Sequence, residues 1–93
     1  MKMSMREFEI KPELDKKLIK LSKKDKSGYE AVMNKIDEVL SSGEIEHYKN
    51  LRYDMKDYKR VHIGHFVLIF IYDKANDFVS FEDYDHHDKV YKR

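Results

Sequence analysis

The run FVLIFIY, from Phe66 to Tyr72, is the longest apolar stretch of this 93-residue chain and constrains its fold most. A helix needs roughly 20 apolar residues to span a bilayer, so this stretch is too short for a transmembrane segment. It is rich in β-branched and aromatic residues and has no polar face, which is typical of a central strand. We therefore expect a sheet with this run near its centre.

Strand patterns also lie on either side of this run. The stretches YKRVHI before it and DFVSFEDYD after it are rich in β-branched and aromatic residues, and Gly64 and the segment DKAND mark the turns between them. Near the N-terminus, MREFEI alternates Phe8 and Ile10 with two glutamates, which is the pattern of a half-buried strand. These patterns predict an N-terminal strand and, later, a three-strand antiparallel meander.

Two amphipathic helices are predicted between the first strand and the meander. Pro12 suits the first turn of a helix that carries Leu14, Leu18 and Leu21 at i, i+4 and i+7. After a break near KKDKSG, a second helix should end at SSG with Gly43 as its cap. Its apolar stripe consists of Tyr29, Val32, Met33, Ile36, Val39 and Leu40. The two helices should form a hairpin whose stripe is ordinary core.

The order strand, two helices, three strands predicts an α+β fold with both helices packed on one face of a mainly antiparallel sheet. We assign residues 1–93 to a single domain because the chain is short. The absence of cysteine excludes disulfides, thiolate metal sites and a cysteine nucleophile, and it is compatible with a reducing cytoplasm. The start MKMSMREFEI turns charged at once, unlike a signal peptide. We expect a cytoplasmic protein that does not enter a membrane.

The net charge of +1 argues against a strongly electrostatic nucleic-acid binder, but the charge is unevenly distributed. Between His47 and His62, five basic residues stand against two acids, with three tyrosines interleaved. The basic residues are Lys49, Arg52, Lys56, Lys59 and Arg60. This stripe is a candidate RNA-binding surface, although a solvated face is the commoner meaning of such a pattern.

The sheet face away from the helices should carry the chemistry. In the segment 58–63, alternation places Val61 and Ile63 on one face and Arg60 and His62, with Tyr58, on the other. Histidine takes and gives a proton near neutrality because its ordinary pKa is about 6.5. Two histidines beside an arginine are the parts that RNA cleavage without a metal requires: a base, an acid and a cation for the phosphate.

The closing stretch DYDHHDKVYKR supplies further candidates in His86, His87 and Tyr91. Adjacent residues of an extended chain point opposite ways, so only one of the two histidines should join the chemical face. The letters HHD also suggest a metal, but paired ligand spacings such as HxxxH or CxxC are missing, so we expect no metal and no cofactor. His47 and His65 are more typical of surface or loop residues.

From the first strand to the end, the chain resembles toxins of the RelE/ParE superfamily of type II toxin–antitoxin modules. The most specific parts are the strand leading into IG, which resembles the family pattern RVRVGDYRVIY, and the closing HHDKVY, which resembles HR-x-x-VY. The resemblance implies a metal-independent endoribonuclease that cuts messenger RNA, in the RelE branch on ribosomes. It also implies a cognate RelB-like antitoxin, a partner with an amphipathic helix, that holds the toxin inactive.

Carried over by position, the resemblance assigns roles to individual residues. Arg60 and Lys59 would hold phosphate, His62 and His87 would be the acid and base candidates, and Tyr91 would stack on or orient a base. His86 is included among the catalytic candidates. The RNA-binding candidates are Lys49, Arg52, Lys56, Lys59, Lys89 and Arg93.

One position departs from the family pattern. Where GDYRVIY has an arginine, GHFVLIF has Val67, which cannot stabilise a developing negative charge. Losing one such contact commonly costs about 10² to 10³ in rate, so either His65, His86 or Arg52 substitutes, or activity is weak, or the target differs. Two alternatives therefore stay open: a ParE-like toxin that acts on DNA gyrase by binding, and an inert family member.

Overall fold

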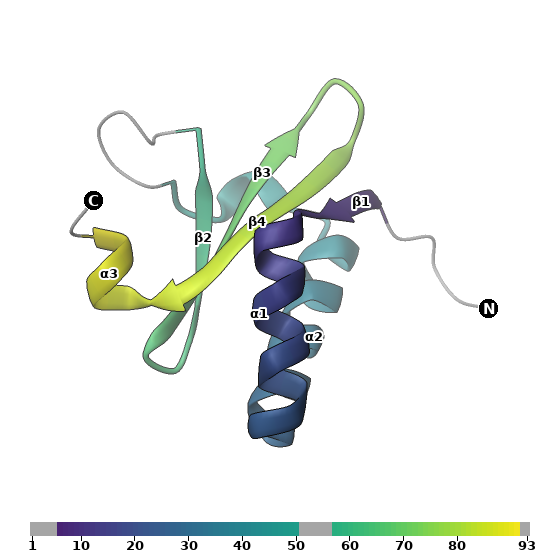
Figure 1. Cartoon of the computed structure of the whole chain (residues 1–93). Helices are drawn as coiled ribbons and strands as arrows, with labels where there is room; N and C mark the ends of the chain where they lie inside the picture. Colours follow the sequence, from purple (N-terminus) through teal and green to yellow (C-terminus); the bar gives the residue numbers. More distant parts are fainter. Residues whose placement is uncertain (1–5, 51–56, 92–93) are drawn as a thin grey trace.

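The computed structural model describes residues 6–50 and 57–91, and it has the predicted α+β order (Figure 1). The N-terminal strand β1 (Glu7–Ile10) leads into helices α1 (Pro12–Lys24) and α2 (Lys26–Ser41) and the short 3-10 helix η1 (Ile45–His47). The meander follows as β2 (Lys59–Ile63), β3 (Phe66–Asp73) and β4 (Phe78–His86). A last helix, α3 (His87–Tyr91), was not predicted. Within the described ranges, no helix is long and apolar enough to cross a membrane.

The four strands form one mixed sheet in the order β1-β4-β3-β2. The meander β2-β3-β4 is antiparallel as predicted, and the apolar run forms β3, which lies between two neighbours. β1 pairs with β4 in parallel, from Glu7 opposite Phe78 to Ile10 opposite Phe81. The sheet is therefore not purely antiparallel. Between β1 and the meander the chain forms the two helices, which cross one face of the sheet.

The main core lies between the helix hairpin and one face of the sheet (Figure 1). Its fully buried members from the helices are Leu14, Leu18, Val32, Ile36, Val39 and Leu40, and those from the sheet are Leu68, Phe70, Val79 and Phe81. Val61 and Ile63 of β2 pack against this core, as their alternation predicted. The helical stripes are thus core, and both helices lie on the same side of the sheet.

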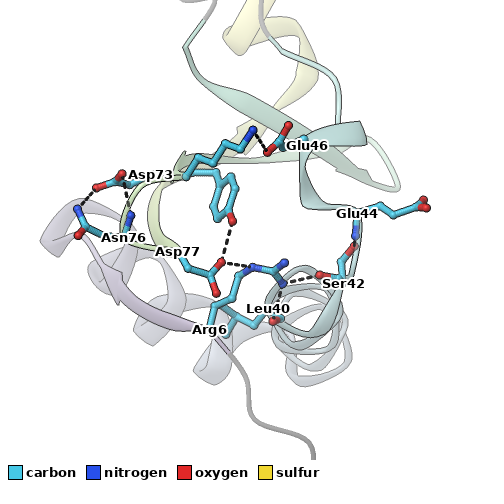
Figure 2. Close-up of polar contacts among 10 residues, drawn as sticks. Arg6, Leu40, Ser42, Glu44, Glu46, Asp73, Asn76 and Asp77 are labelled. Atoms are coloured by element: carbon cyan, nitrogen blue, oxygen red, sulfur yellow. Dashed lines mark hydrogen bonds and ion pairs between the residues drawn. The ribbon is translucent and has the colours of Figure 1, made fainter.

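The C-terminal end of α2 is capped by a distant side chain and not by Gly43, so that prediction was wrong (Figure 2). The guanidinium of Arg6 donates from Nη1 to the carbonyl oxygens of Leu40, at 3.1 Å, and of Ser42. Its Nε donates to Asp77 Oδ1 at 2.8 Å, in the turn between β3 and β4. Arginine donors satisfy the carbonyls that a helix end leaves without partners, so a left-handed glycine is not required.

Arg6 also joins three parts of the fold, since its partners lie on α2 and on the β3–β4 turn while Arg6 itself precedes β1. Asp77 accepts a second hydrogen bond, at 2.7 Å, from the hydroxyl of Tyr72, and the Arg6 guanidinium lies 5.6 Å from the centre of the Tyr72 ring. The Arg6 side chain is only 16 % exposed. This contact therefore holds β1 beside the start of β4.

We expect Arg6→Ala to lower the free energy of unfolding by about 2 kcal/mol, because it removes the guanidinium that donates to the helix-end carbonyls and to the Asp77 carboxylate. Urea unfolding followed by circular dichroism measures the change. Lys74→Ala is the matched control, since it also removes a cation, in this case from a solvated pair with Glu46. Equal losses for the two variants would contradict the role of Arg6.

Candidate functional site

The last helix covers the sheet face that lies away from the helix hairpin. Val90 of α3 is 3 % exposed and packs against Val67 and Ile69 of β3, with Tyr58 at the margin of this second cluster. The backbone N–H of His87 donates to the carbonyl oxygen of His65 at 3.0 Å, which ties the start of α3 to the β2–β3 turn. Helix α3 therefore packs against β3 and lies beside β2 (Figure 1).

This packing explains the valine that departs from the family pattern. Val67 is fully buried beneath Val90, and its cross-strand partner on β2 is His62. A cation at position 67 would lie under the apolar side of α3, where its charge would lose water. Val67 therefore packs against α3, and its side chain has no charge that could bind phosphate.

Four of the chain's five histidines gather where the β2–β3 turn meets the start of α3. The rings of His62 and His87 are 6.0 Å apart between centroids. The ring of His86 lies 6.3 Å from that of His65, nearly parallel to it, and 5.4 Å from Phe66. Thus the ring of His87 lies near His62, and the ring of His86 lies near His65 in the turn. The centroids of the His86 and His87 rings are 6.3 Å apart.

The charge state of His62 is set by its surroundings. Partial burial of the ring lowers the pKa of His62 below its ordinary value of 6.5, and the positive charges of Arg60 and His87 lower it further. Both the partial desolvation and the neighbouring charges disfavour the protonated ring. The ring is therefore neutral at pH 7 and has a lone pair that can accept a proton.

The structure divides the basic candidates between the two faces of β2. Arg60 is half-buried on the α3 side, where its cross-strand partner is Ile69. Lys59 lies on the opposite face, and its ammonium donates to the carbonyl oxygens of Glu46 and Tyr48 and to Asn50 Oδ1, at 3.0 to 3.3 Å. Three acceptors use all the donors of an ammonium group. Lys59 thus holds the segment after η1 and is not brought to the Arg60 face.

The other candidates fall into two groups. Lys49 and Lys89 are exposed, the first after η1 and the second on α3. Arg52, Lys56, Arg93 and the side chain of Tyr91 lie outside the described residues, so their predicted roles stay predictions.

Asp88 is the acidic group of the histidine cluster. Its Oδ1 is 3.1 Å from His87 Nδ1 and its Oδ2 is 3.9 Å from His86 Nδ1. Single ligand atoms of His86, His87 and Asp88 lie within 4.8 Å of one another, which makes these residues the metal-binding candidate of the described chain. Sequence spacing missed this convergence because a strand ends and a helix begins between the two histidines.

Comparison with known proteins gives two relatives, at 50 % and 49 % identity over most of the chain, and several similar folds. A protein of Methanocaldococcus jannaschii named "Putative toxin RelE4" is 50 % identical over 90 residues, which are 96 % of this chain and 94 % of the relative. No family model matches the sequence. The name of this relative favours the RelE branch over the gyrase-binding alternative.

Two solved structures share the fold at low sequence identity. The isolated E. coli RelE toxin has a TM-score of 0.70 at 22 % identity and covers 94 % of this chain and 92 % of its own. The toxin–antitoxin complex RelE–RelB of the archaeon Pyrococcus horikoshii contains a chain with a TM-score of 0.68 at 14 % identity, with 89 % and 96 % covered.

If Val90 holds the chain end in place, Val90→Asn should release α3, because a buried amide without a partner is costly. We expect the His87 amide to exchange with solvent faster by at least about tenfold, since its bond to the His65 carbonyl opens more often. Lys89→Gln, at the neighbouring exposed position, should leave the exchange rate as it is. Hydrogen exchange measured by NMR on both variants decides, and unchanged protection in Val90→Asn would show that other contacts hold α3.

Proposed function

Because this chain belongs to the RelE family of toxins, we propose that it is a metal-independent endoribonuclease that cleaves messenger RNA, on the ribosome, and is restrained by a cognate antitoxin. The observation that best supports the proposal is the approach of His62 and His87, which come from distant parts of the sequence to a ring separation of 6.0 Å. At this separation both rings can reach the same phosphodiester.

The proposed reaction is attack of a ribose 2′-hydroxyl on the adjacent phosphorus, with departure of the 5′-oxygen. His62 removes the proton of the 2′-hydroxyl, because its lowered pKa keeps the ring neutral. His87 donates a proton to the leaving 5′-oxygen, and Arg60 stabilises the negative charge on the phosphate. The phosphorus–oxygen bond to the 2′-oxygen forms as the bond to the 5′-oxygen breaks, so no metal ion is required.

The cation missing at Val67 is replaced in this proposal by the histidines of the β2–β3 turn and the end of β4. His65 is exposed and His86 is half-exposed, and both lie beside the His62–His87 pair. Each can donate an N–H to a phosphate oxygen. Tyr91, which ends α3, would position a base, and Lys49 and Lys89 would bind flanking phosphates.

The antitoxin is proposed to be an amphipathic helix with acidic residues. Ile19 on α1 is 49 % exposed and Phe66 near the histidine cluster is 38 % exposed, so apolar side chains are accessible on two sides of the molecule. A helix that covers one of them and extends acidic residues to the cluster would exclude RNA. The RelE–RelB complex of the archaeal neighbour supports a partner of this kind.

Replacing either member of the histidine pair should abolish most of the cleavage. We expect His62→Ala and His87→Ala each to lower the rate by about 10² to 10⁴, the usual contribution of a positioned acid or base. The assay is cleavage of messenger on programmed ribosomes in EDTA, with His47→Ala as the control. His47 is an exposed histidine on η1 and lies outside the cluster. Wild-type rates for both cluster variants would overturn the assignment.

The pH dependence follows from the lowered pKa of His62. The base acts without its proton and the acid, His87, acts with one, so the cleavage rate should rise with pH through a midpoint below 6.5 and fall once His87 has lost its proton. Single-turnover rates between about pH 5 and pH 8, together with an NMR titration of the His62 ring, measure this midpoint. Arg60→Gln should move the NMR midpoint upwards, since one of the charges that lower the pKa is gone. A midpoint above 6.5 in the wild type would contradict His62 as the base.

A further inference from the structure

We propose that His86, His87 and Asp88 form a binding site for a divalent transition metal of the zinc type, and that its occupation switches the nuclease off. The three side chains present one ligand atom each within 4.8 Å of one another. Ligands of tetrahedral zinc lie about 3.3 Å apart, as its bonds of about 2.0 to 2.1 Å require. The side chains are 41 to 63 % exposed, so small rotations close this difference.

The fold gives these consecutive residues a common direction. His86 ends β4 and His87 begins α3, so the chain turns between them instead of continuing in alternation. The Asp88 carboxylate lies between the two imidazoles, with a different oxygen near each Nδ1. The backbone N–H of Asp88 donates to His86 Nδ1 at 3.2 Å, so this nitrogen acts as an acceptor beside the Asp88 carboxylate. A metal replaces this hydrogen bond when it binds.

The ligand types determine which metal fits. Two imidazoles and one carboxylate suit zinc, copper or nickel, whereas magnesium and calcium require mainly oxygen ligands. Three protein ligands leave a fourth position for water or for an oxygen of a bound phosphate. Copper should bind more tightly than zinc in such a set, but zinc has no redox chemistry and is the cleaner probe.

The consequence for activity rests on the proposed function. A metal on either nitrogen of His87 prevents its ring from becoming the imidazolium cation that would protonate the leaving oxygen, so the acid is lost. The metal also places positive charge beside His62 and Arg60. The same cluster can thus cleave RNA without a metal and be inhibited by one.

Calorimetric titration of the untagged protein with zinc chloride tests the site itself. We expect one equivalent to bind to the wild type, and His86→Ala and Asp88→Asn to weaken binding by at least about tenfold, the loss that changing even an outer partner of a metal produces. His47→Ala, which removes a histidine elsewhere, should bind like the wild type, and magnesium should give no binding. No zinc binding to the wild type, or equal weakening by His47→Ala, would overturn the site.

Cleavage assays separate the failure of the site from the failure of the proposed function. If the protein cleaves RNA, zinc should stop cleavage and EDTA should restore it, with His47→Ala inhibited at the same zinc concentration as the wild type. Cleavage that continues at saturating zinc would overturn the switch. If the protein does not cleave RNA under any condition, the proposed function fails, and the calorimetric result still decides whether the metal site exists.

Discussion

The central strand β3 is apolar on both faces, and this constraint organises the rest of the molecule. Leu68 and Phe70 are covered by the helix hairpin, but Val67 and Ile69 face the other way. Burying a valine or isoleucine contributes roughly 1.5 to 3 kcal/mol, which a domain of this size needs. The second face is covered by Val90, so the position of the chain end is a result of core packing. His87 is brought to His62 by the same contact.

The buried part of the site, formed by Val67, Ile69 and Val90, is consequently apolar, and the positive charge of Arg60 lies beside it. The buried side of α3 and the floor at Val67 are apolar, while Arg60 is half-buried beside them. Partial desolvation and the neighbouring Arg60 and His87 lower the pKa of His62. Val67, which departs from the family pattern, thus packs against Val90 and provides an apolar neighbour for His62. In the proposed function Val67 makes no contact to phosphate, and His65 and His86 take that role.

Much of the fold was predictable because the periodic patterns are local. The helices, the antiparallel meander and the central place of β3 follow from apolar spacing. Three features depend on residues far apart in sequence and were not predicted: the parallel pairing of β1 with β4, the cap on α2 from Arg6, and the helix α3. For α3, Val90 is the one buried apolar residue in a strongly polar segment, so no periodicity marks it.

For the candidate site, strand alternation correctly placed Arg60 and His62 on the face opposite Val61 and Ile63. The resemblance to known toxins pointed to His87. The same alternation could have shown that Lys59 belongs to the opposite face from Arg60. The sequence HHD was noted and set aside as a metal site, because the convergence of its side chains depends on the change from strand to helix between His86 and His87.

The pairing of β3 with β4 contains an irregularity whose effect reaches the end of the chain. Ile69 lies opposite Asp83 and Phe70 opposite Phe81, so Glu82 is one residue more than a regular ladder would hold. Up to Phe81 the odd-numbered residues of β4 face the helices, whereas after Glu82 the even-numbered Tyr84 does. This extra residue sets the register that places His86 opposite Phe66, so the adjacent His87 is the ring that lies beside His62. The position of each histidine is thus set by the register shift at Glu82, several residues earlier in β4, and not by the chemistry of the imidazole rings.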